Sequence, residues 1–96
     1  MEQAHQLKAP AAQLRPSPEV VARRLDRTGV LVHLRTNGVF ELNETGIRIW
    51  ELIAEGRSHQ EIVSQLVQEF EVDAARASAQ LDECVDRLRR EGLLSV

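Results

Sequence analysis

The hydrophobic pattern of this chain changes its period at Asn43, and that change limits the fold more than any other feature. Before Asn43, short runs rich in β-branched residues are separated by turn residues, as strands are. After Asn43, small and apolar residues recur at helical spacing, first at Gly46, Ile49, Trp50 and Ile53. The order predicts a sheet followed by helices in two layers, which is an α+β fold.

The segment from Glu19 to Leu42 predicts a three-stranded antiparallel meander. Its strand-like runs are residues 20–25, 30–35 and 39–42. We expect Thr28-Gly29 to break the chain between the first two runs. We expect Asn37-Gly38 to form a type I′ hairpin turn, in which both residues take positive φ angles.

Capping residues mark three helices after residue 43. Asn43 and Asp73 are predicted N-caps, and Ser58 is predicted to form a capping box with Glu61. The last two helices, joined by a tight turn, are typical of a helix-turn-helix. Glycines are expected to end the first and third helices, at Gly56 and Gly92.

Length and composition indicate one small domain. The chain has 96 residues, and all three of its prolines lie within residues 1–18. We therefore expect a flexible N-terminal arm over residues 1–18 and a folded domain over residues 19–96. One cysteine, Cys84, excludes an internal disulfide and a multi-cysteine metal site. No apolar run reaches the ~20 residues of a membrane span, and no secretory signal opens the chain, so a cytoplasmic protein is expected.

The sequence offers no constellation for catalysis. Cys84 falls in the apolar stripe of the third helix, where a thiol is usually unreactive. The histidines His5, His33 and His59 lack metal-binding spacing, and no glycine-rich phosphate loop occurs. We expect no enzyme activity, no cofactor and no metal. The third strand leaves an open sheet edge, which can bind an extended peptide as an added strand.

Several segments resemble the PqqD-like proteins. Residues 42–52, LNETGIRIWEL, fit that family's L-N-x-T-(A/G)-x-x-I-W-x-L signature. Further matching segments stand in the same order along the chain: residues 16–22, 30–34, 37–42, 61–63, 70–73 and 88–94. The resemblance covers roughly residues 16–96.

The resemblance implies a winged helix-turn-helix-like domain that recognises peptides and has no catalytic residues. Such domains bind the leader segment of a ribosomally made precursor peptide and present it to a modifying enzyme. That enzyme is a radical S-adenosylmethionine protein in pyrroloquinoline quinone synthesis and a leader peptidase in lasso-peptide pathways. The leader pairs with the third strand and lies between that strand and the third helix.

The resemblance assigns peptide pairing to the third strand and leaves two flanks of the third helix as the opposite wall. One flank holds Arg76, Ala77, Gln80, Cys84 and Arg87, and the other holds Ala75, Ser78, Asp82 and Arg89. The first flank is preferred because Ala77 and Cys84 leave a shallow, partly apolar groove. Family members often carry an acid near position 80, where this chain has Gln80. The predicted peptide-binding residues are Val39, Phe40, Glu41, Leu42, Arg76, Ala77, Gln80, Cys84 and Arg87.

Two other functions fit the same pattern of elements. A winged-helix DNA-binding regulator is disfavoured by charge, because residues 43–96 hold six arginines against eleven acids. A dimerisation module would use the exposed third strand or a swapped N-terminal arm to form a homodimer. The expected partners are therefore a leader peptide and its modifying enzyme, without nucleic acid or membrane.

Overall fold

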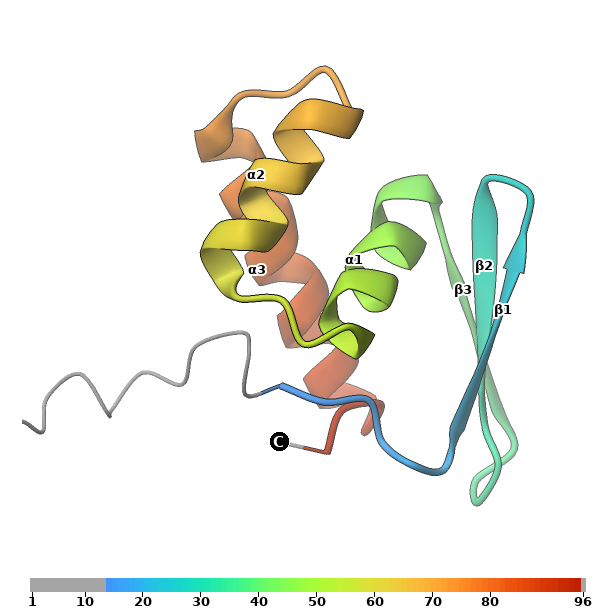
Figure 1. Cartoon of the computed structure of the whole chain (residues 1–96). Coiled ribbons are helices and arrows are strands. Elements are labelled where there is room, and N and C mark those ends of the chain that lie inside the picture. Colours follow the sequence, from blue (N-terminus) through green and yellow to red (C-terminus); the bar gives the residue numbers. More distant parts are fainter. Residues whose placement is uncertain (1–13, 96) are drawn as a thin grey trace, which may run out of the picture.

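The computed structural model describes residues 14–95 and contains the predicted α+β fold (Figure 1). A sheet comes first, with strands β1 at Val20–Leu25, β2 at Thr28–His33 and β3 at Gly38–Leu42. Three helices follow, α1 at Glu44–Ala54, α2 at His59–Glu69 and α3 at Ala74–Arg90. The prediction of a winged helix-turn-helix-like topology, with a three-stranded antiparallel sheet followed by three helices, is confirmed.

The sheet is a meander with β2 in the centre, and its two faces differ in burial. Val21 pairs with Val32, which pairs with Val39, so these side chains share the face away from the helices. Leu31 and Leu42 lie on the opposite face and are buried. The helices lie on one side of the sheet, next to this buried face (Figure 1).

The first hairpin turns at Asp26 and Arg27, two residues earlier than predicted. Asp26 has a φ of 60°, and Thr28 and Gly29 belong to β2. The predicted break at Thr28-Gly29 is therefore wrong. Gly29 has a packing role instead, since a Cβ atom there would lie only 2.9 Å from Ile47 Cβ of α1.

The second hairpin has a four-residue loop in place of the predicted type I′ turn. His33 pairs with Gly38, and the Asn37 N–H donates to the His33 carbonyl over 2.7 Å. Asn37 has a φ of 63°, whereas Gly38 is not among the described residues with positive φ. The prediction of two positive φ angles is wrong because this longer loop needs one left-handed residue, at its last position. The second strand consequently ends at His33 and not at Arg35.

Each helix begins at the residue that the sequence marks as its cap. The side chain of Asn43 accepts a backbone N–H from the first turn of α1, and Asp73 does the same for α3. Ser58 and Glu61 form the predicted capping box, with reciprocal hydrogen bonds of 3.1 and 2.9 Å. These caps satisfy N–H groups that have no partner inside a helix.

The end of α3 has the predicted left-handed glycine. Gly92 has a φ of 74°, and the Leu93 N–H donates to the Leu88 carbonyl over 2.9 Å. Leu88 and Leu93 are both buried, which completes the hydrophobic contact of a Schellman end. This ending turns the chain back toward its N-terminal segment.

The first described residues pair with the C-terminal segment. The Ser17 N–H donates to the Leu93 carbonyl over 2.9 Å, and the Ser95 N–H donates to the Arg15 carbonyl over 2.8 Å. Leu14 is 3% exposed and belongs to the core. Residues 14–17 thus pack on the domain, while residues 1–13 of the predicted arm lie outside the described residues. The division of the chain at residue 18 stays a prediction.

The core joins the inner face of the sheet to all three helices. Trp50 of α1 is 4% exposed and belongs to the core, as its helical spacing with Ile49 and Ile53 indicates. On α2, Ile62 and Leu66 are fully buried, whereas Val67 is 37% exposed. In the described part of the chain, no helix has the length and hydrophobicity needed to cross a membrane. The buried apolar residues are Leu14, Leu31, Leu42, Ile47, Ile49, Trp50, Leu52, Ile53, Ile62, Leu66, Ala77, Leu81, Leu88 and Leu93.

Candidate functional site

β3 is an edge strand, because β2 is the strand that pairs with it within residues 14–95. The direction of its free backbone groups follows from the register. The Leu34 N–H donates to the Glu19 carbonyl over 2.8 Å, next to the pairing of β1 with β2. Backbone groups alternate in direction along an antiparallel strand, so residues 29, 31 and 33 of β2 direct theirs toward β3.

Two residues of β3 therefore direct their backbone groups away from the sheet. Phe40 pairs with Leu31 and bonds to β2, whereas its neighbours Val39 and Glu41 direct their N–H and C=O groups outward. A contact from α3 agrees with this direction, since Arg87 Nη2 donates to the Glu41 carbonyl over 3.3 Å. The edge of β3 thus presents the donors and acceptors that an added strand requires.

A groove of about 770 Å³ lies between this edge and α3. Leu42, Ile49 and Cys84 give it an apolar component, and Glu41, Glu83 and Arg87 supply its charged groups. The sheet pairing of β3 ends at Leu42, so the tip of the first hairpin extends past it and borders the groove. The remaining lining residues are Leu25, Thr28, Gly29, Val30, Asn43, Thr45, Gly46 and Gln80.

The side of α3 that faces the groove is fixed by the core. Leu81 and Leu88 are fully buried, which sets the rotation of the helix. Residues three and four positions apart lie on one helix face, so Gln80, Cys84 and Arg87 line the groove together. This is the flank that the sequence analysis prefers.

The structure places several of the predicted residues in the groove and separates others from it. Glu41, Leu42, Gln80, Cys84 and Arg87 line it.

The other predicted residues lie elsewhere. Val39 is 64% exposed on the outer face of the sheet, and its backbone alone reaches the free edge. Phe40 packs against the core, and Ala77 is fully buried. Arg76 is exposed in the first turn of α3, outside the groove lining.

Glu83 is a groove residue that the sequence analysis missed. It follows Gln80 by three positions, so the helical spacing already contains the signal for it. The residues at the start of α1, Asn43, Thr45 and Gly46, were missed for a different reason. They reach the groove because α1 begins directly after β3, and a Cβ on Gly46 would lie 3.3 Å from Leu42 Cβ.

The thiol of Cys84 is shielded inside the groove wall. Burial raises the pKa of Cys84 to about 11, and the positive charge of Arg87 acts in the opposite direction. A thiol with this pKa is almost entirely protonated at neutral pH and is a poor nucleophile. Among the described residues, no group of three or more His, Cys, Asp and Glu side chains is placed to hold a metal ion. The arrangement as a whole suits the binding of an extended chain.

Comparisons with known proteins agree with this geometry. The family model described as coenzyme PQQ synthesis protein D (PqqD) matches residues 28–94. The structure of TbiB1 in complex with the TbiA(beta) leader peptide is similar, with 34% identity and a TM-score of 0.78, over 84% of this chain and 94% of TbiB1. The structure of a lasso peptide synthetase B1 complexed with the leader peptide has 25% identity and a TM-score of 0.80, over 88% of this chain and 99% of that protein. A comparison with curated proteins finds no match. The fold, the signature after β3 and the family match together place this chain in the PqqD family.

Proposed function

We propose that this protein is a non-catalytic adaptor that binds the leader segment of a ribosomally made precursor peptide. The leader adds to the sheet as a strand beside β3 and lies against α3. The observation that carries the proposal is the free β3 edge, which forms one wall of the groove, with α3 opposite. The two similar solved structures support it, because both hold a leader peptide.

Strand addition divides recognition between backbone and side chains. The outward groups of Val39 and Glu41 bond to any extended backbone and so supply affinity without sequence preference. Alternate peptide side chains then point into the groove, whose apolar lining comes from Leu42, Ile49 and Cys84. The groove therefore recognises a leader through the side chains of every second residue of the bound segment.

Binding the leader also brings the rest of the precursor to an enzyme. We propose that the partner is a modifying enzyme of the pathway, such as a radical S-adenosylmethionine protein or a leader peptidase. A peptide held by its leader has a high effective concentration at a neighbouring active site. The adaptor then accelerates modification without contributing a catalytic group.

DNA binding receives no comparable support. The helix that would enter a DNA groove is α3, and its Asp82, Glu83 and Asp86 side chains are exposed. Carboxylates on a reading helix repel the phosphate backbone. Both of the similar solved structures are complexes with a leader peptide, and neither is described as bound to DNA.

The proposal is tested by an NMR titration of the ¹⁵N-labelled protein with the TbiA(beta) leader peptide. This peptide is a rational probe because its partner TbiB1 is 34% identical to this chain. We expect saturable shifts at Val39–Leu42 and at Gln80, Cys84 and Arg87. The exposed face of α2, including Gln60 and Gln68, should not shift. A scrambled peptide of the same composition is the control.

Three other results would overturn the proposal in distinct ways. Equal shifts with the scrambled peptide would indicate non-specific association. Broad shifts with duplex DNA at low salt, without a response to the leader, would favour a winged-helix regulator. Concentration-dependent shifts at β3 in the protein alone would favour pairing with a second copy, which sedimentation equilibrium would confirm.

A further inference from the structure

The Arg87 side chain occupies a backbone acceptor that an added strand would use. Its Nη2 donates to the Glu41 carbonyl, one of the outward acceptors on the β3 edge. The distance of 3.3 Å is longer than the usual 2.9–3.0 Å of an N–H···O hydrogen bond. The contact is therefore weak and exchangeable, and it occupies one acceptor of the β3 edge without blocking the edge.

Arg87 differs from the arginines that hold the fold together. Arg24, Arg35 and Arg48 each bond to a carboxylate over 2.7 to 3.0 Å. Within residues 14–95, Arg87 has no carboxylate within 4.0 Å, although Glu83 lies one turn before it on the same helix. Its hydrogen bond to the Glu41 carbonyl leaves most of the five guanidinium donors available.

From this placement we propose that Arg87 occupies the Glu41 carbonyl of the empty β3 edge and, when a leader binds, transfers to a carboxylate of that leader. The inference rests on the proposed function. An incoming peptide N–H takes the Glu41 carbonyl and displaces the guanidinium. Arg87 is then covered by the peptide, and a buried donor without an acceptor is costly. An Asp or Glu side chain facing α3 at this point supplies that acceptor in two-pronged geometry.

The same geometry predicts what stands beside the acid in the leader. Side chains two residues apart on an added strand point to the same side. A side chain two positions further toward Asn43 meets Leu42, Ile49 and Cys84, so it should be apolar. Glu83 also borders the groove and disfavours a second acid there. The leader segment thus carries an acid and an apolar residue separated by one position.

The test uses versions of the TbiA(beta) leader in which each residue of the bound segment is replaced in turn by Glu and by Gln. Affinities are measured by fluorescence anisotropy for the wild-type protein, Arg87→Gln and Arg89→Gln. Arg89→Gln is the matched control, because it removes the same charge from α3 outside the groove. At one position we expect the Glu peptide to bind wild type about fivefold more tightly than the Gln peptide, as a partly covered ion pair at the wall of the groove allows.

That Glu preference should fall to about one in Arg87→Gln and persist in Arg89→Gln. The Gln peptide should bind Arg87→Gln at least as tightly as wild type, because nothing then competes for the Glu41 carbonyl. The role of Arg87 is overturned if wild type prefers Glu over Gln at no position of the peptide. It is also overturned if Arg87→Gln shows the same Glu preference as wild type. Failure of wild type to bind any version overturns the proposed function instead. An NMR spectrum of each variant verifies that the fold is intact.

Discussion

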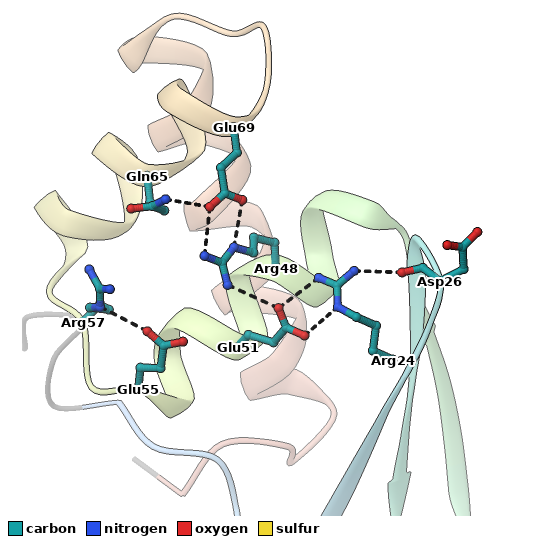
Figure 2. Close-up of polar contacts among 8 residues, drawn as sticks. All are labelled: Arg24, Asp26, Arg48, Glu51, Glu55, Arg57, Gln65 and Glu69. Atoms are coloured by element: carbon teal, nitrogen blue, oxygen red, sulfur yellow. Dashed lines mark hydrogen bonds and ion pairs between the residues drawn. The ribbon is translucent and has the colours of Figure 1, made fainter.

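Arg48 of α1 and Glu69 of α2 form a two-pronged ion pair, with Nε–Oε1 at 2.8 Å and Nη2–Oε2 at 2.9 Å (Figure 2). Arg48 also contacts Glu51, which receives two hydrogen bonds from Arg24 of β1. Gln65 adds a hydrogen bond to Glu69. The network connects a strand and two helices through side chains that are only partly exposed. Because the fold already restricts the rotamers of these side chains, forming the ion pairs costs little further side-chain entropy.

We expect the Arg48–Glu69 pair to stabilise the fold measurably. Each of the variants Arg48→Gln and Glu69→Gln should lower the free energy of unfolding by about 0.5–1 kcal/mol, and the double variant should lose less than their sum. Urea denaturation gives the coupling energy. The Arg57–Glu55 pair is the control, because both side chains are more than 40% exposed and close in sequence. Equal coupling in the two pairs would contradict the prediction.

The acid limb of the stability curve should depend on the same network. The hydrogen bond from Arg24 holds the pKa of Glu51 below its ordinary value of 4.5, and the one from Arg48 does the same for Glu69. A carboxyl whose pKa is lower in the folded state stabilises the fold at all pH values above its unfolded pKa. That contribution is lost as the pH falls below 4.5 through the folded pKa.

Wild type should therefore lose more stability between pH 6 and pH 3 than Glu51→Gln or Glu69→Gln. Urea midpoints at several pH values measure the difference. Glu55→Gln, on the exposed pair with Arg57, should retain the wild-type slope. Parallel curves for all four proteins would show that the network does not carry this pH dependence.

Gly29→Ala should destabilise the protein by about 1–3 kcal/mol, as overpacking a core usually does. The added Cβ would lie 2.9 Å from Ile47 Cβ and in still closer conflict with the rest of that side chain. Thermal unfolding should show a smaller loss when Gly29→Ala is made in an Ile47→Ala background, because the truncated side chain leaves room. If the stability losses of Gly29→Ala and Ile47→Ala simply add in the double variant, the added Cβ does not clash with Ile47.

The elements of this fold were predictable where local chemistry decides them. Asn43, Ser58 and Asp73 cap helices by contacts within one turn, so the sequence alone marks the helix starts. Gly92 with Leu93 is equally local. The hairpin turns were mispredicted because their register depends on which side chains the core accepts. Gly29 resembles a turn residue, but contact with Ile47, which lies on another element, places it inside β2.

The groove was predictable only in part, for the same reason. Cys84 and Arg87 follow from the helical period once the core face of α3 is known. Ala77 lies four residues before Leu81 on the core-facing stripe of α3 and is fully buried with it, so it faces the core and not the groove. Glu83 and Arg87 stand four residues apart on α3, as do Asp86 and Arg90, and this spacing favours ion pairs. Neither pair is among the salt bridges of the described residues. Sequence spacing permits such pairs but does not exclude a competing acceptor such as the Glu41 carbonyl.

Cys84 should react slowly with iodoacetamide, and its rate should continue to rise with pH up to about 11, since burial raises the pKa of the thiol to that value. At pH 8 only about one molecule in a thousand carries the reactive thiolate. The rate is measured by mass spectrometry, with the urea-unfolded chain as the control. A plateau near pH 9 in the folded protein would contradict the shift. Binding of a leader should slow the alkylation of Cys84 further, because Cys84 lines the groove.

A proline placed on the β3 edge should separate peptide binding from folding. The N–H of Glu41 points away from β2, so Glu41→Pro removes a donor for the added strand and keeps the β2–β3 ladder. Ala22→Pro is the matched control on the opposite edge, where backbone groups also point outward from β2. Both variants should give folded-protein NMR spectra.

Only Glu41→Pro should then weaken binding of the TbiA(beta) leader, by about tenfold or more, because the proline ring removes a hydrogen bond and obstructs the approaching strand. Isothermal titration calorimetry measures both variants against wild type. The same loss in Ala22→Pro would point to the β1 edge or to a general effect on the sheet. Unchanged binding in Glu41→Pro would exclude pairing at this edge. A leader N-methylated at single positions repeats the test on the intact protein, with losses expected at alternate residues only.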